Sequence, residues 1–270
     1  MSPDSVFARA LDSLKCEIVR CPDPAQLEAR CCYWSAILDT RRNVSKDSVR
    51  RLVSRSIELC DSASYPYDMA RFRHLEGLLL FPDNSFRQHE AFRDCFDYFS
   101  SQGDGFMTAW LALDLGRLYL DIGDLKRAGW YYSLSDSILD LIGIDDWHIK
   151  TSLNNANVLH LMGKNKEALA NLDSLLANPV ARRDTGFCVN VLINKYLMSG
   201  DSLAIVEARS LVHSGIPVSV CMDLNLALSG WYCSEGHAAE ALPCLEWLLS
   251  LPLEDRPADE IRDVYGIAAR

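Results

Sequence analysis

The chain has 270 residues, of which 49% are hydrophobic, and this excludes intrinsic disorder over most of its length. Its net charge of -10, from 37 acidic and 27 basic residues, argues against direct binding to nucleic-acid phosphates by this segment. The sequence shows neither a signal peptide nor an apolar stretch long enough to span a bilayer. We therefore expect a chain that is cytoplasmic as given, or periplasmic if it is a trimmed part of an exported or membrane-tethered protein.

The first third of the sequence predicts helices and no strand, because no segment alternates between apolar and polar residues with period two. Asp23 can cap a helix whose first position is Pro24, and Ser45 can cap the next helix. Pro82 and Gly103 mark the boundaries of a further pair. The predicted helices cover residues 25–39, 45–61, 67–81 and 85–100.

The remaining sequence contains an internal repeat. Gly-x-x-x-Glu-Ala-Leu begins at both Gly163 and Gly236, a third copy begins at Gly123, and a weaker one begins at Gly200. These glycines follow one another after 40, 37 and 36 residues. That period is typical of a helix-turn-helix unit of about 34 residues with slightly longer loops.

The copy around Gly123 predicts how the two helices of a unit pack. One helical face combines apolar residues with a glycine: Ala112, Leu115, Gly116 and Tyr119. Gly116 would let the second helix approach closely, and Gly123 would end the first helix in the left-handed conformation. On the second helix, Ala128 and Tyr132 share a face, so small residues would meet large aromatic ones across the pair.

These residues resemble the tetratricopeptide-repeat pattern, which Leu115-Gly116, Tyr119, Gly123-Asp124, Ala128 and Tyr132 fill except for its final proline. The resemblance implies an all-α fold, a right-handed α-α superhelix (a tetratricopeptide-like solenoid) of about six antiparallel helix pairs. Residues 1–105 would form diverged N-terminal helical pairs, and residues 106–270 would form repeats that continue the same solenoid.

The arrangement is also similar to the repeat domain of bacterial tetratricopeptide regulators. This resemblance implies a non-catalytic scaffold or sensor module that binds a protein or peptide, as the sensing part of a transcriptional regulator. The sequence ends inside what looks like a new first helix beginning near Pro257, which favours a fragment of a longer protein. Association of copies into a homo-oligomer through that helix is a further hypothesis.

In the family, the first helix of each pair lines a concave groove, and the repeat register selects candidate residues for it. Asparagine is a poor helix former, and its amide can both donate to and accept from the backbone of an extended peptide. Arg117 and Lys150 could pair with a carboxylate. The alternative is that the asparagines cap turns or face water. The groove candidates are Trp110, Arg117, Lys150, Asn157, His160, Asn190 and Asn194.

No enzyme motif is present, so we expect no catalytic residues, no cofactor and no metal. The six histidines do not form His-Glu-x-x-His, and neither a nucleophile elbow nor a phosphate-binding loop occurs. Asp145 and Asp146 are expected to cap a helix, and the ten cysteines to be mostly buried, reduced thiols. The alternative hypothesis is a small-ligand binder or enzyme with a pocket in the N-terminal third, where carboxylates and histidines would converge.

Overall fold

The computed structural model describes residues 3–42, 44–80 and 85–251, and these form thirteen α-helices and no strand. The prediction of an all-α fold is confirmed. The chain divides into two compact units, residues 1–138 and residues 139–270. The boundary predicted between residues 105 and 106 separates diverged helical pairs from better-preserved repeats, and it stays a prediction.

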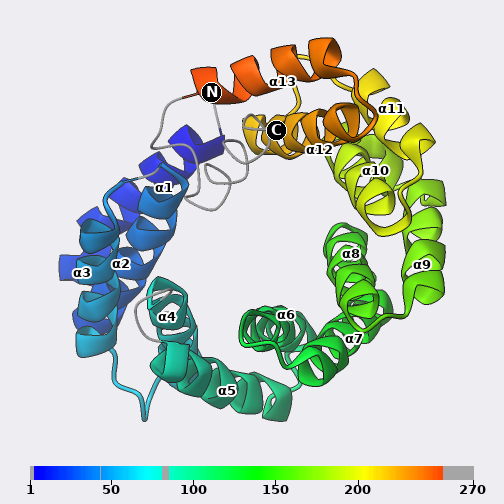
Figure 1. Cartoon of the computed structure of the whole chain (residues 1–270). Helices are drawn as coiled ribbons and strands as arrows, with labels where there is room; N and C mark the ends of the chain where they lie inside the picture. The colour runs from blue at the N-terminus through cyan, green and yellow to red at the C-terminus, as the bar shows by residue number, and fades with distance from the viewer. Residues whose placement is uncertain (1–2, 43, 81–84, 252–270) are drawn as a thin grey trace. The chain divides into compact units, whose positions relative to one another are not determined.

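The first unit is a succession of antiparallel helices, each in contact with the next from α1 to α6 (Figure 1). As predicted, the side chain of Asp23 accepts a hydrogen bond from the backbone N–H of Gln26, and that of Ser45 accepts one from the N–H of Ser48. The boundary predicted at Pro82 lies outside the described residues. The helices are α1 (Pro3–Glu17), α2 (Pro24–Arg41), α3 (Lys46–Leu59), α4 (Pro66–Leu79), α5 (Ser85–Ser101), α6 (Gly105–Asp121) and most of α7 (Leu125–Ile142).

The packing of α6 on α7 follows the predicted contact between a glycine and an aromatic ring. A Cβ atom at Gly116 would lie 2.7 Å from two ring carbons of Tyr132, so only glycine fits there. Burial raises the pKa of the Tyr132 phenol well above its usual range. The same arrangement recurs between α4 and α5, where a Cβ at Gly77 would lie 2.7 Å from the Phe92 ring. The diverged N-terminal part thus uses the same close approach of helices as the well-preserved repeat.

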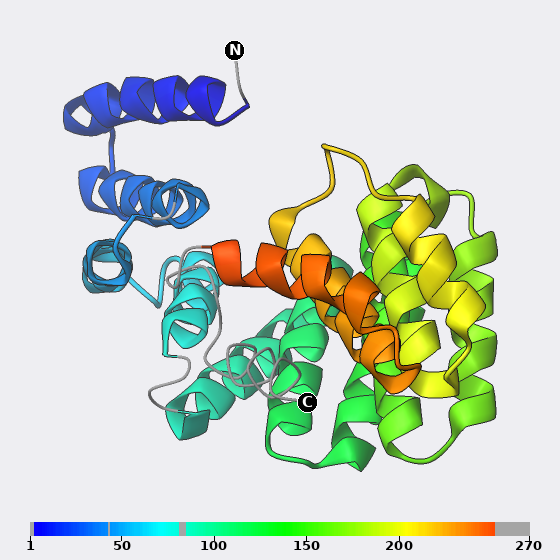
Figure 2. The same ribbon diagram turned by 45° about the horizontal axis from the view of Figure 1, so that its top comes forward.

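The second unit contains three helix pairs, each joined by a tight turn (Figure 2). Within this unit, α8, α10 and α12 form one layer and their partners α9, α11 and α13 form the other (Figure 1). The predicted turn glycines Gly163, Gly200 and Gly236 have φ angles of 76°, 71° and 77°, a conformation that glycine adopts readily. The helices are α8 (Asp145–Leu161), α9 (Asn165–Ala177), α10 (Thr185–Ser199), α11 (Ser202–Ser210), α12 (Val218–Ser234) and α13 (Ala238–Ser250).

One local prediction was wrong, and one lies outside the described residues. Ile144, rather than an aspartate, is the N-cap of α8, because the chain is already helical at Asp145. Asp145 and Asp146 lie in the first turn, where their negative charges favour the positive end of the helix dipole. The helix predicted to begin near Pro257 lies outside the described residues.

All ten cysteines are free thiols, but only five of them are buried, whereas the sequence predicted that most would be. The pKa of the Cys95 thiol is raised to about 12, mainly by burial. The negative charge of the nearby Asp94 carboxylate also raises it. A thiol with such a pKa stays protonated at neutral pH and is a poor nucleophile. The five buried cysteines therefore pack as small apolar residues.

A buried polar pair connects α4 to α6 in the first unit. His74 Nε2 lies 2.8 Å from Asp114 Oδ2, and both side chains are buried. Phe92 and Trp110 meet the imidazole edge to face, with ring centroids 5.6 Å and 5.4 Å away. The apolar rings exclude water from the pair, so each partner depends on the other for its hydrogen bond.

Gly116→Ala is expected to destabilise the protein by about 1–3 kcal/mol, because the added methyl group meets the Tyr132 ring. Gly230→Ala in α12 is the matched control, since a Cβ there meets nothing within 4 Å. This control should gain about 0.5–1 kcal/mol from the lower entropy of the unfolded chain. Urea unfolding of the three proteins measures both values, and equal stability of the Gly116 variant and the wild type would refute the packing argument.

Asp114→Ala is expected to cost about 1–3 kcal/mol, because it leaves the buried His74 Nε2 without its hydrogen-bond partner. Replacement of both residues by alanine should cost less than the sum of His74→Ala and Asp114→Ala, since neither polar group then lacks its partner. Thermal unfolding monitored by circular dichroism measures the four proteins of this double-mutant cycle. Strict additivity would mean that the pair contributes no coupling energy.

Candidate functional site

The layer formed by α8, α10 and α12 carries two adjacent open hollows that share Asn190. The first, of about 330 Å³, is lined by Lys150, Leu153, Asn154, Asp184, Gly186, Phe187, Asn190, Pro217 and Val220. The second, of about 370 Å³, is lined by Asn190, Ile193, Asn194, Tyr196, Leu197, Asp223, Leu226, Ala227 and Gly230. We call the two together the asparagine groove. Because Asn190 lines both, the two hollows lie next to each other on α8, α10 and α12.

Three amide side chains lie along the asparagine groove. Asn194 donates from Nδ2 to the backbone carbonyl of Asn190 at 2.8 Å, which leaves its Oδ1 available as an acceptor. Among the described residues, the side-chain amides of Asn154 and Asn190 form no hydrogen bond. All three residues are only half-buried, so their amides can exchange water for a ligand. An extended peptide needs such alternating donors and acceptors along its backbone.

The charged groups of the first hollow differ in how they are held. Asp184 is occupied as the N-cap of α10, where its Oδ1 accepts from the Phe187 N–H at 2.9 Å. Lys150 is exposed, and its ammonium nitrogen lies 5.9 Å from the centroid of the Trp147 ring. A cation–π contact of this kind at an exposed site is weak. Lys150 can therefore turn toward an anionic group in the groove at little cost.

The second hollow contains one carboxylate, that of Asp223. No ion pair or hydrogen bond joins this side chain to any other residue in the part of the chain that the structure describes. Burial raises the pKa of Asp223 above its usual value, because the apolar walls of the hollow disfavour the charged form. Asp223 is nonetheless an exposed residue, and it lines the hollow together with Leu226, Ala227 and Leu197.

The structure brings together three of the predicted groove residues, Lys150, Asn190 and Asn194. Asn157 lines neither hollow, and its Oδ1 is enclosed without a hydrogen bond from the described residues. His160 is held at the end of α8, where its Nδ1 lies 2.9 Å from Asn165 Oδ1. These placements concern geometry alone, and the role of the predicted residues in binding stays a prediction.

The two other predicted residues, Trp110 and Arg117, belong to α6 in the first unit. Trp110 is half-buried and packs against His74 and Phe106, with ring centroids 5.4 Å and 5.8 Å away. Arg117 is exposed. Neither residue can be assigned to the asparagine groove, which lies wholly in the second unit.

The prediction missed the contribution of α12, although the sequence contained the signal. Phe187, Asn190 and Asn194 precede their turn glycine by thirteen, ten and six residues. Asp223, Leu226 and Gly230 stand at the same distances before Gly236, and all three line the second hollow. The same register applied once more would have identified them.

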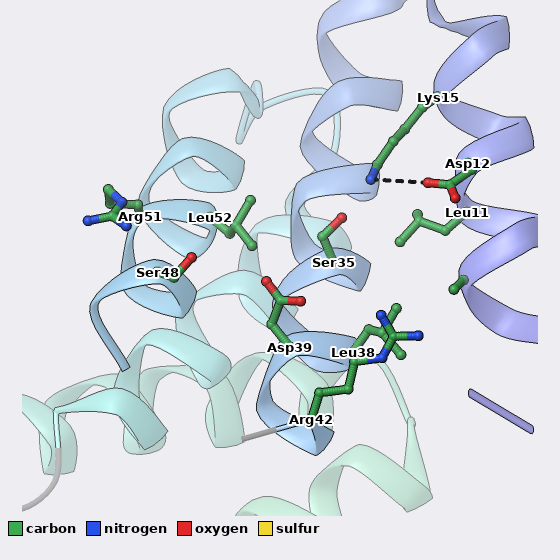
Figure 3. Close-up of a pocket in the computed structure, with 11 residues that line it drawn as sticks. Leu11, Asp12, Lys15, Ser35, Leu38, Asp39, Arg42, Ser48, Arg51 and Leu52 are labelled. Carbon is green, nitrogen blue, oxygen red and sulfur yellow. Dashed lines mark ion pairs between the residues drawn. The ribbon is translucent and has the colours of Figure 1, made fainter. Parts of the chain in front are cut away.

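The N-terminal third contains its own hollow of about 440 Å³ between α1, α2 and α3 (Figure 3). Asp12 and Lys15 form an ion pair at 3.6 Å on one side of it, and Arg51 lies on the opposite side. The second carboxylate is that of Asp39, and no lining residue is a histidine. This site lacks the cluster of carboxylates and histidines that an acid–base enzyme of the alternative hypothesis would need.

No group of three or more His, Cys, Asp or Glu side chains among the described residues is arranged to hold a metal ion. In the same part of the chain, no helix combines the length and the apolar composition that crossing a bilayer requires.

Comparison with known proteins identifies the fold. No protein-family model matches the sequence, and no curated protein sequence matches it. The apo form of RapI is structurally similar, with a TM-score of 0.68 and 12% identity over 89% of this chain and 85% of that one. A Rap protein complexed with competence and sporulation factor is also similar, with a TM-score of 0.63 and 13% identity over 97% of this chain and 72% of that one. Yeast Tom70 has a TM-score of 0.54 and 10% identity over 98% of this chain and 59% of that one.

The chain has a tetratricopeptide-type fold. At these identities the similarity establishes the fold and leaves the ligand to be argued from this chain's own residues.

Asp223→Asn is expected to raise the melting temperature at pH 7. The folded state raises the pKa of this carboxyl above its unfolded value near 3.8, so ionisation at neutral pH favours the unfolded chain. The difference from the wild type should shrink as the pH falls through the raised folded value, and should vanish below 3.8, where the wild-type carboxyl is protonated in both states. Glu207→Gln, which removes an exposed carboxylate of α11, is the control. A lower melting temperature for Asp223→Asn at pH 7 would contradict this account.

Proposed function

We propose that the chain is a non-catalytic binding module that holds an extended peptide, or an extended segment of a protein, in the asparagine groove. The observation that carries the proposal is the row of amides from Asn154 to Asn194 along a groove with apolar walls. Backbone-directed hydrogen bonds give affinity for a peptide, and apolar hollows take its alternate side chains.

The groove has charged groups of both signs. Lys150 and Asp184 line the first hollow, and Asp223 lines the second. Charges at the two ends of a binding site select the register of a ligand more than they add to its affinity.

The comparisons support a ligand-binding role without naming a ligand. One Rap protein of similar fold is complexed with competence and sporulation factor. A module of this fold can therefore hold a ligand, and its second unit here offers an open groove for one. The hollow between α1, α2 and α3 has no histidine beside its two carboxylates, so its lining gives no support to the enzyme alternative.

We propose further that this binding serves as the sensing step of a transcriptional regulator. This finer proposal rests on the resemblance of the repeats to those of bacterial tetratricopeptide regulators. A ligand that favours one packing of α8, α10 and α12 over another would shift the populations of the two packings. The reading frame followed beyond Arg270 tests the proposal, since a DNA-binding module encoded there would support it.

The test of the binding function is selection of peptides from a display library of random heptamers on the purified chain. Selected peptides are expected to bind the wild type, and Asn190→Ala with Asn194→Ala should weaken them about 10–100-fold through the loss of two amide contacts. Fluorescence anisotropy measures the affinity, and far-ultraviolet circular dichroism verifies that the helices are intact.

Asn155→Ala with Asn171→Ala is the matched control, because these asparagines of α8 and α9 line neither hollow of the groove. The control should bind as the wild type does. Equal loss of binding in the control and the groove variant, or no loss in either, would mean that the asparagine groove is not the binding site.

A further inference from the structure

Arg71 of α4 is a cation that the first unit holds against two aromatic rings without giving it a carboxylate. Its guanidinium carbon lies 5.0 Å from the centroid of the Tyr33 ring and 4.9 Å from that of the Trp34 ring, both on α2. The residue is half-buried, and its Nε is enclosed without a hydrogen-bond acceptor among the described residues. Few buried polar atoms lack a partner in folded proteins, so this one requires an explanation.

The two rings beside Arg71 are themselves held by other aromatic residues. Phe7 of α1 meets Trp34 edge to face, with 5.7 Å between the centroids, and Phe72 of α4 packs on Tyr33 at 5.1 Å. The Tyr33 hydroxyl also accepts a long hydrogen bond, of 3.4 Å, from Arg71 Nη2. An arginine held in this way has already lost much of its side-chain freedom, which lowers the entropic cost of binding a ligand.

The contact with the rings leaves the hydrogen-bonding capacity of Arg71 largely unused. A cation–π contact depends on the charge of the guanidinium and occupies none of its N–H donors. Tyr33 is the one acceptor that the described residues offer to this side chain, and no carboxylate among them forms an ion pair with it. A guanidinium that is partly removed from water without a counter-charge costs free energy, which an arriving carboxylate would offset.

The aspartates that flank Arg71 are engaged with other residues. Asp68, three residues before it on α4, pairs at 2.7 Å with Arg30 of α2. Asp114 of α6 lies 2.8 Å from His74, which is three residues after Arg71. Arg30 and His74 thus take these two carboxylates, and Arg71, between them along the chain, has none.

The repeat register gives Arg71 the position of a groove residue. Arg71 precedes the packing glycine Gly77 by six residues, as Trp110 precedes Gly116. In the same register, Trp110 corresponds to Lys150, which lines the first hollow of the asparagine groove. Arg71 is therefore the counterpart, in the first unit, of a cation that lines the groove in the second.

We propose that Arg71, with the rings of Tyr33 and Trp34, forms a site for a carboxylate of a peptide or protein segment, supplied by an acidic side chain or by the C-terminus. The carboxylate accepts charge-assisted hydrogen bonds from Arg71 Nη1 and Nη2, which the planar fork of arginine suits. A phosphate group fits less well, since it is commonly held by a cluster of arginines. The site belongs to the first unit and goes beyond the proposed function of the asparagine groove.

The experiment uses the full chain with ¹⁵N-labelled arginine, because the Nε–H groups give separate NMR signals. Arg71→Lys identifies the signal of Arg71, which should exchange slowly with water since its Nε is enclosed. The probes are three pools of N-acetylated hexapeptides without Asp or Glu at their random positions. The first pool adds a fixed glutamate and an amidated C-terminus, the second a fixed glutamine and a free C-terminus, and the third a fixed glutamine and an amidated C-terminus.

The first or the second pool should shift the Arg71 signal and bind about tenfold more tightly than the third, which has no carboxylate. The pool with the larger effect identifies the source of the carboxylate. Arg71→Gln should abolish the difference between the pools, and Arg71→Lys should retain only part of it, because an ammonium lacks the planar fork.

Arg73→Gln is the matched control, since it removes an exposed cation of the same helix that pairs with Glu76 at 3.8 Å. This variant should bind the pools as the wild type does, and thermal unfolding verifies that every variant is folded. A carboxylate preference that persists in Arg71→Gln would place the site elsewhere. Equal binding of the three pools, or binding of none, would reject the site.

A last variant separates this site from the asparagine groove. Asn190→Ala with Asn194→Ala should leave the ligand-induced shift of the Arg71 signal unchanged, whatever the fate of the groove function. Loss of the shift in that variant would contradict an independent site in the first unit.

Discussion

The close approach of paired helices, made possible by a glycine under an aromatic ring, is the contact on which the rest of this structure depends. At Gly116 and again at Gly77, a methyl group would stand 2.7 Å from the ring of the partner helix. Interiors of proteins are packed too densely to absorb such an overlap without displacement of the helices. In these two pairs of the first unit, a contact between few atoms therefore sets how closely the helices approach.

In the second unit, apolar packing within the helix pairs leaves one face of α8, α10 and α12 available for polar residues. Because α9, α11 and α13 bury the apolar faces of their partners, the opposite faces of α8, α10 and α12 need not contribute to the core. Buried residues of α10 such as Val189 and Leu192 pack in the cluster that also includes Ile205. Asn190 and Asn194 occupy the other side of the same helix, where the cost of asparagine in a helix is small compared with the packing energy.

The sequence predicted the architecture well because the repeat is a local signal. Turn glycines, caps and the small-to-aromatic pattern each depend on residues a few positions apart, and Gly123, Gly163, Gly200 and Gly236 all take the expected positive φ. The pair of His74 and Asp114 could not be predicted in this way. Forty residues separate the two, neither belongs to the repeat pattern, and only the stacking of α4 near α6 brings them together.

The sequence predicted only some of the residues that line the groove. Position in the repeat register alone does not tell which residues face an open surface. Asn157 and Asn194 stand at the same distance before their turn glycines, yet the amide oxygen of Asn157 is enclosed whereas Asn194 lines the groove. Register assigns a residue to a helical face, but the neighbouring helices decide whether that face stays open. Asp223 illustrates the converse, since its register marks it as a groove position while the absence of a nearby cation is visible only in three dimensions.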